Sequence, residues 1–167
     1  MVKLNLGCGG QIRSIKEPEW IDIDLYSSDP HVKKADMKKL DFLEDNSVDE
    51  IELWHSAEHL GKFEYKEAFK EWYRVLKLGG VLHINVPDIL WVAKQLILNN
   101  GDLDANLGCS LRDCIFGDQS GPGQFHLTGF TKASITKDLS AVGFKDINAV
   151  EGFWHNEQLC LDVKAKK

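Results

Sequence analysis

Short apolar runs and polar, turn-forming segments alternate along the first half of the chain. Four apolar runs, at residues 2–6, 20–25, 32–35 and 48–54, have the length of β-strands rather than of helices. The second run alternates apolar and acidic residues, which is typical of a strand. The turn residues Asp-Asn-Ser precede the fourth run. This pattern predicts four strands before the first long helix.

A helical period follows at residues 64–77. Six apolar side chains recur there every three or four positions and predict a helix with one face against a sheet: Tyr65, Ala68, Phe69, Trp72, Val75 and Leu76. We expect Gly79 and Gly80 to end this helix, and residues 81–86 to form a fifth strand that Pro87 closes.

The second half of the chain predicts fewer elements. Residues 89–98 predict a helix, and residues 99–129 form the longest irregular stretch, of a length that is usually functional or mobile. A last helix is predicted at residues 131–142, with Thr131 as its N-cap and Gly143 beyond its end. Residues 144–150 and 158–163 would be two closing strands, so the chain as a whole predicts an α/β fold.

The first apolar run ends at three glycines within four positions, Gly7, Gly9 and Gly10. Glycine can adopt positive φ and expose bare backbone N–H groups, and ligands of open α/β sheets bind at this edge. The dinucleotide fingerprint G-x-G-x-x-G, counted from Gly7, requires glycine at its sixth position, where this chain has Ile12. This departure argues against a nucleotide-dependent oxidoreductase.

An acidic residue, Asp24, lies near the end of the second strand, seventeen residues beyond Gly7. In nucleotide-binding sheets a carboxylate at this place accepts hydrogen bonds from ribose hydroxyls. We therefore predict that Asp24 binds ribose, and we expect Asp22 to be a solvated carboxylate.

Length and charge restrict the functional class. With 167 residues, 43% of them hydrophobic, the chain predicts a single soluble domain over residues 1–167. Its net charge of −6 argues against a nucleic-acid partner, and no apolar stretch predicts a signal peptide or a membrane span. Cys8, Cys109, Cys114 and Cys160 show no C-x-x-C spacing, so we predict no metal site and free thiols in a cytoplasmic protein.

Four segments, in this order and spacing, resemble the motifs of class I S-adenosylmethionine-dependent methyltransferases, and of the small methyltransferase type 11 proteins in particular. They are residues 4–9 (LNLGCG), 20–24 (WIDID), 35–51 (ADMKKLDF leading to DNSVDEI) and 71–82 (EWYRVLKLGGVL). The resemblance covers nearly the whole chain. It implies a Rossmann-like fold with helices on both faces of a mostly parallel seven-stranded sheet, whose C-terminal strand is antiparallel, and S-adenosylmethionine as the cofactor.

The resemblance also implies roles for individual residues. The glycine loop would wrap the methionine part of the cofactor, Asp24 would take the ribose, and Asp36 and Met37 would flank adenine. The implied cofactor-binding residues are Asn5, Gly7, Cys8, Gly9, Gly10, Asp24, Asp36, Met37 and His55. Asn5 stands where many relatives have an acidic residue, Gln11 replaces a later glycine, and Leu78 replaces a proline.

Histidine is the residue type that would serve as a general base, which methyl transfer needs only when the acceptor keeps its proton at neutral pH. The candidates are His55 and His59 after the fourth strand, and His126 in the irregular stretch, which we predict to contact substrate. A structural hydrogen bond is the alternative for each of them. His83 is expected to be structural, and no motif supports His31 or His155.

These observations predict a methyltransferase that acts on an oxygen or nitrogen of a small molecule or sugar precursor. The absence of an Asn-Pro-Pro-Tyr-like motif argues against methylation of nucleic-acid bases. The alternative from another class is a non-catalytic, S-adenosylmethionine-binding partner subunit that keeps the fold. The sequence predicts no oligomeric state.

Overall fold

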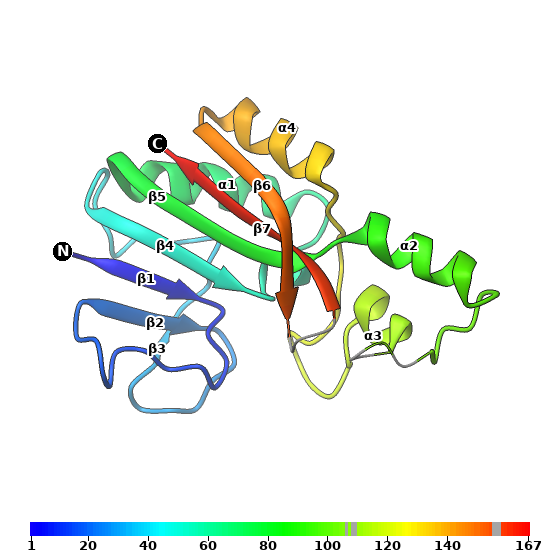
Figure 1. The fold of residues 1–167 in the computed structure, drawn as a ribbon. Coiled ribbons are helices and arrows are strands. Elements are labelled where there is room, and N and C mark those ends of the chain that lie inside the picture. Colours follow the sequence, from blue (N-terminus) through cyan, green and yellow to red (C-terminus); the bar gives the residue numbers. More distant parts are fainter. Residues whose placement is uncertain (106, 108–109, 155–157) are drawn as a thin grey trace.

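The computed structural model describes residues 1–105, 107, 110–154 and 158–167, and it is built around one seven-stranded sheet (Figure 1). The strand order is β3-β2-β1-β4-β5-β7-β6. The strands are β1 (Lys3–Leu6), β2 (Trp20–Asp24), β3 (Lys33–Lys34), β4 (Val48–Trp54), β5 (Leu76–Pro87), β6 (Lys145–Trp154) and β7 (Gln158–Lys166). The helices are η1 (Ala57–His59), α1 (Glu64–Val75), α2 (Ile89–Leu98), α3 (Leu111–Phe116) and α4 (Lys132–Val142).

The pairing of the strands confirms the predicted fold class. Strands β1 to β5 pair in parallel, whereas β7 runs antiparallel between β5 and β6. The carboxyl ends of β1, β2 and β4 therefore meet at one edge of the sheet, where open α/β sheets bind ligands.

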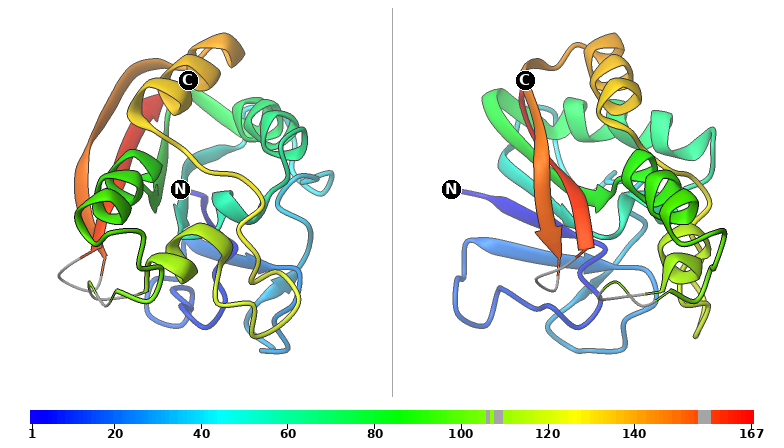
Figure 2. Two further views of the ribbon diagram at one scale, coloured as in Figure 1. Left: turned by 90° about the vertical axis from the view of Figure 1, so that its right-hand side faces the viewer. Right: turned by 45° about the vertical axis from the view of Figure 1, so that its right-hand side comes forward.

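One face of the sheet is apolar because aligned positions of neighbouring strands carry aliphatic side chains. Leu4 of β1 aligns with Ile51 of β4, Ile51 with Leu82 of β5, and Leu82 with Ala165 of β7. Helices α1 and α4 cover this face, with Trp72 and other apolar side chains fully buried. Figure 2 shows the helices on the same side of the sheet.

The opposite face of the sheet is polar. Asn5, Asp22, Glu52 and His83 are buried there and bind one another or nearby groups. The segment between β1 and β2 forms no helix, and in the described parts of the chain no helix covers this face (Figure 2). The two faces therefore differ, because helices α1 and α4 cover the apolar face and the described strands present a paired polar layer on the other.

Most element boundaries agree with the prediction, with three differences. Helix α1 ends at Val75, and Gly79 and Gly80 lie inside β5 rather than at a helix end. A Cβ at Gly80 would lie 2.9 Å from the Lys77 carbonyl oxygen, which explains the glycine at this bend. The irregular stretch contains α3, and η1 follows β4. Cys109 and His155 lie outside the described residues.

The N-cap prediction for the last helix is confirmed. Thr131 caps α4, with its hydroxyl accepting from the Ser134 N–H and the Ser134 hydroxyl accepting from the Thr131 N–H. Among the described helices, none combines the length and apolar character that a membrane crossing requires.

Candidate functional site: a cofactor cavity beside a histidine cluster

A cavity of about 1000 Å³ opens at the carboxyl ends of β1, β2 and β4. This volume is typical of sites that bind small molecules or cofactors. Four segments supply its predicted site residues, namely Gly7, Cys8, Gly9, Gly10, Asp24, Asp36, Met37, His55 and His59. Residues 123–125 and 127, from the irregular stretch, complete the wall.

The glycine loop is shaped by two positive φ angles. Gly7 has a φ of +64°, and a Cβ there would lie 2.5 Å from the Ser56 Cβ, so only glycine fits. Gly9 has a φ of +53°, and a Cβ at Gly9 or Gly10 would meet nothing within 4 Å. The loop therefore presents bare backbone to the cavity.

Asp24 ties this loop to the end of β2. Its Oδ2 accepts from the Gly9 N–H at 2.9 Å, and its Oδ1 accepts from the N–H groups of Tyr26 and Ser27. A carboxylate oxygen has two lone pairs, so Oδ2 can still accept a ligand hydroxyl. The predicted ribose-binding role fits this placement.

Asn5 and Asp22 support the loop from beneath. The Asn5 amide donates to the Gln11 carbonyl at 2.8 Å and to the Asp22 carboxylate at 2.7 Å. Asp22 is 1% exposed, so it is a buried anchor and not the solvated carboxylate that we expected. Burial alone would raise its pKa, yet hydrogen bonds from Ser14, Arg13 and Asn5 hold that pKa below its ordinary value. Asn5 does not line the cavity but holds the loop through Gln11 and Asp22, and its predicted contact with the cofactor stays a prediction.

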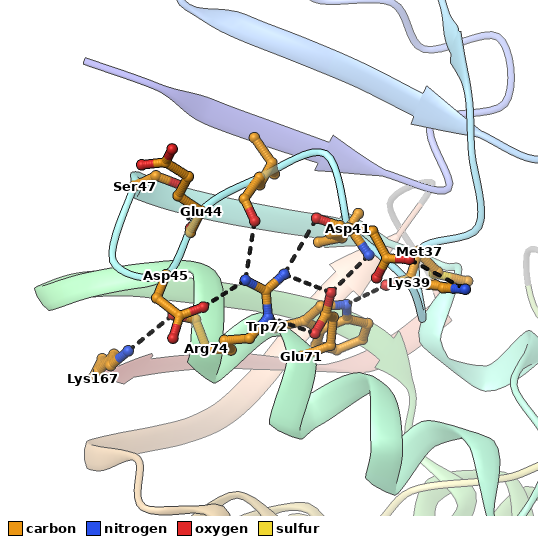
Figure 3. Close-up of polar contacts among 12 residues, drawn as sticks. Met37, Lys39, Asp41, Glu44, Asp45, Ser47, Glu71, Trp72, Arg74 and Lys167 are labelled. Atoms are coloured by element: carbon orange, nitrogen blue, oxygen red, sulfur yellow. Dashed lines mark hydrogen bonds and ion pairs between the residues drawn. The ribbon is translucent and has the colours of Figure 1, made fainter.

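Helix α1 holds the segment of the cavity wall that contains Asp36 and Met37. The Trp72 indole donates to the Met37 carbonyl at 2.8 Å, and Arg74 donates to the carbonyls of Leu40 and Leu43 (Figure 3). Glu71 pairs with Arg74 at 2.8 Å. The segment after Met37 is thereby fixed to α1, which keeps Asp36 and Met37 at the cavity wall.

Cys8 lies in the loop as a buried thiol. Burial, together with the negative charges of Asp22 and Asp24, raises the pKa of the Cys8 thiol to about 12. A thiol in this state is a poor nucleophile. Cys8 therefore contributes shape to the loop rather than covalent chemistry.

The segment after β4 carries a group of ionisable side chains around Glu58. Glu58 is 1% exposed, and its Oε1 lies 3.3 Å from the His55 Nδ1 and 3.9 Å from the His126 Nε2. Burial alone would raise the pKa of Glu58, but His55, His59 and His126 together lower it. His55 has a φ of +49°, which is rare for a residue with a side chain and is typical of functional sites.

The other two histidines join the segment after β4 to the irregular stretch. His59 lies within 3.0 Å of the Phe125 carbonyl through Nδ1 and 3.1 Å of the His55 carbonyl through Nε2. His126 contacts the Cys114 carbonyl at 3.0 Å through Nδ1. Burial lowers the pKa of His126, which favours its neutral form.

The structure thus brings the three predicted histidines together, although not at one surface. His55 and His59 line the cavity, whereas His126 lies behind its wall with Nε2 turned toward Glu58. The predicted contact of His126 with substrate stays a prediction. Sequence reasoning missed Ser56 and Glu58, although both lie between the predicted candidates His55 and His59.

Comparison with solved structures places this architecture in a class. A methyltransferase from Archaeoglobus fulgidus is 16% identical, with a TM-score of 0.67 over 99% of this chain and 85% of that one. A possible histamine N-methyltransferase from Thermotoga maritima is 15% identical, with a TM-score of 0.67 over 99% and 82%. The Burkholderia thailandensis 1,6-didemethyltoxoflavin-N1-methyltransferase, solved with S-adenosylhomocysteine, is 14% identical, with a TM-score of 0.66 over 99% and 70%. These similarities define a class I methyltransferase fold.

The family follows from the sequence. The family model described as "hypothetical methyltransferase" matches residues 1–95, more than half of the chain, and the chain belongs to this family. No curated protein sequence matches the chain significantly. The chain is an S-adenosylmethionine-dependent methyltransferase. The bare backbone at Gly9 and Gly10 and the acceptor oxygen of Asp24 fit that cofactor.

Proposed function

We propose that the protein transfers a methyl group to an oxygen or nitrogen of a small molecule or sugar precursor. The observation that carries this proposal is the closeness of the two cavity walls. A Cβ at Gly123 would lie 2.4 Å from the Tyr26 ring, so the irregular stretch packs directly against the segment after β2. A cavity bounded in this way suits a small acceptor better than a polymer.

The net charge of the chain also supports a small-molecule acceptor. The chain has a net charge of −6, whereas nucleic-acid binding depends on clustered Lys and Arg. Two structural neighbours, from Thermotoga maritima and Burkholderia thailandensis, carry names of small-molecule N-methyltransferases. We propose a similar size of acceptor here, and leave its identity to the assay below.

The protein's part in the reaction is to position the two reactants. S-adenosylmethionine supplies the activated methyl group, and we propose that the glycine loop, Asp24, Asp36 and Met37 hold it. His55 and His59 line the same cavity, and we propose that they border the acceptor. Residues 123–127 would exclude water from that side.

The remaining proposals concern the protein as a whole. We propose that residues 1–167 form a single catalytic domain, because β1 and β7 belong to one sheet. We also propose a cytoplasmic location, which the buried free thiol of Cys8 supports. A non-catalytic partner subunit is the alternative, but the family match does not favour it.

The test is a methyl-transfer assay with radiolabelled S-adenosylmethionine. Pools of small amines, phenols and sugar nucleotides are compared with tRNA, DNA and protein extract as acceptors. We expect label in a small-molecule pool, and its loss in Asp24→Ala but not in Asp41→Ala, whose carboxylate is exposed and pairs with Lys39 outside the cavity. Label found only in polymer pools would overturn the choice of acceptor, and binding of the cofactor without any transfer would favour the partner subunit.

A further inference from the structure

The buried carboxylate of Glu58 is not explained by cofactor binding. It does not line the cavity, and among the described residues neither of its oxygens receives a hydrogen bond. A buried carboxylate without hydrogen bonds is costly unless it is paired or binds a metal ion. The His55 Nδ1 lies 3.3 Å from the Glu58 Oε1 and helps to lower the pKa of this carboxylate, while the Glu58 Oε2 has no partner among the described residues.

Glu58, His59 and His126 have the arrangement of metal ligands. One carboxylate oxygen and one nitrogen from each ring lie within 4.8 Å of one another. Ligand atoms at about 2.0–2.2 Å from one ion are about 3–4 Å apart, and the Glu58 Oε1 lies 3.9 Å from the His126 Nε2. Small side-chain rotations therefore suffice to bring the three groups onto one ion.

The surroundings of His126 are those of a ligating histidine. Its Nδ1 lies 3.0 Å from the Cys114 carbonyl, so this nitrogen carries the proton and donates. The Nε2 lone pair then points toward Glu58. Metal-binding histidines are oriented in this way, by a carbonyl that accepts from the other ring nitrogen. His59 has a carbonyl oxygen near each ring nitrogen and can keep one of these bonds while the other nitrogen binds an ion.

We propose that Glu58, His59 and His126 hold one divalent transition-metal ion at the wall of the cavity. Two imidazoles and one carboxylate select ions such as Zn²⁺, Co²⁺, Fe²⁺ or Mn²⁺ over Mg²⁺ and Ca²⁺, which prefer oxygen ligands alone. The proposal departs from the sequence-based prediction that the chain has no metal site. That prediction failed to find the group because His126 is 67 positions from His59 and the ligands follow no short spacing rule.

The place of the ion suggests its use, a step that rests on the proposed function. His59 lines the cavity, so an ion held by these residues borders the space that an acceptor would occupy. Three protein ligands leave a coordination position open, and there the ion can bind an acceptor oxygen and lower its pKa. The proton released from that oxygen passes to solvent or to a neighbouring base.

The experiment is a Co²⁺ titration of the protein without a histidine tag, followed by its d–d absorption and by calorimetry, with Mg²⁺ as the comparison ion. Glu58→Gln and His126→Gln are the test variants. His31→Gln is the matched control, because that ring is exposed and pairs with Asp29 away from the cluster. Thermal unfolding without metal shows whether each variant is folded.

We expect one Co²⁺ per wild-type chain with nitrogen-type absorption bands, an unchanged result for His31→Gln, and an affinity at least about tenfold lower in each folded test variant. Absence of saturable Co²⁺ binding in the wild type would overturn the proposal. So would a folded Glu58→Gln or His126→Gln protein that binds Co²⁺ as tightly as the wild type. S-adenosylhomocysteine binding, measured on the same samples, reports separately on the proposed function.

Discussion

At the scale of single residues, Gly7 and Gly9 show two different reasons for glycine in one loop. Both have positive φ, but only at Gly7 would a Cβ collide with a neighbour, the Ser56 side chain at 2.5 Å. We expect Gly7→Ala to lower the free energy of unfolding by about 3 kcal/mol, through backbone strain and overpacking together. Gly9→Ala, which has strain alone, should cost about 1 kcal/mol. Urea unfolding of both variants checks this order, and equal losses would contradict it.

Cys8 gives a second prediction at this scale. Its pKa of about 12 leaves only ~10⁻⁴ of the thiol ionised at pH 8. Alkylation by iodoacetamide in the folded protein should therefore be at least about a hundredfold slower at Cys8 than in urea. Mass spectrometry of the peptide that contains Cys8 measures both rates. Rapid modification of Cys8 in the folded protein would show that the thiol is neither buried nor held neutral.

At the scale of elements, α1 both covers the sheet and holds the segment of the cavity wall that contains Asp36 and Met37. Arg74→Ala removes the donor to the Leu40 and Leu43 carbonyls and leaves Glu71 without its cation (Figure 3). We expect a loss of about 2 kcal/mol of unfolding free energy together with weaker cofactor binding. Lys70→Ala, on the same helix but exposed and paired only with Glu67, should change stability by less than about 0.5 kcal/mol. Similar losses in the two variants would show that the Arg74 contacts are unimportant.

The polar face joins β4, β5 and β7 through His83. Its Nε2 lies 3.0 Å from Asp162, and its Nδ1 lies 3.6 Å from Glu52. Burial alone would lower the pKa of His83, but hydrogen bonds to Glu52 and Asp162 raise it above the ordinary value of 6.5. A raised folded-state pKa stabilises the protein fully below the unfolded value, and that stabilisation disappears as the pH rises through the folded value.

The raised pKa of His83 predicts that the stability of the protein depends on pH. Between about pH 6 and about pH 8.5, the wild type should lose about 1 kcal/mol of unfolding free energy that His83→Gln does not lose. Urea unfolding at a series of pH values measures this difference, with His31→Gln as the exposed control. Identical pH profiles for the wild type and His83→Gln would contradict a charged His83 in the folded state.

The elements also show what sequence reasoning could reach. The core strands and α1 were predictable because their apolar periods are set by burial against one face. The polar face of the sheet was not predictable from the sequence. Its residues are separated along the chain and become neighbours only through the strand register: Asn5, Asp22, Glu52 and His83. The prediction that Gly79 and Gly80 end a helix was wrong. A Gly-Gly pair is typical of a helix end, and the sequence alone does not distinguish this from a tight bend inside a strand.

At the scale of the whole molecule, the position of the glycine loop, Asp24 and Met37 at the cavity was predictable, whereas the meeting of Glu58 with His126 was not. Gly7, Asp24 and Met37 belong to motifs of fixed spacing, and each lies at the cavity as predicted. Glu58 and His126 meet only because residues 126–128 fold back onto η1, where Leu127 and Thr128 donate to the Glu58 carbonyl. A contact between segments so distant in sequence leaves no local pattern.

The central claim is that this cavity binds S-adenosylmethionine through Asp24 and the glycine loop. Calorimetric titration with S-adenosylhomocysteine tests it most directly, in the wild type, Asp24→Ala, Asp24→Asn and Asp41→Ala, with NAD as the comparison ligand. We expect one site per chain in the wild type and in Asp41→Ala, an affinity about tenfold or more lower in folded Asp24→Ala, a smaller loss in Asp24→Asn, and no binding of NAD. Absence of binding to the wild type, or undiminished binding to Asp24→Ala, would contradict the account.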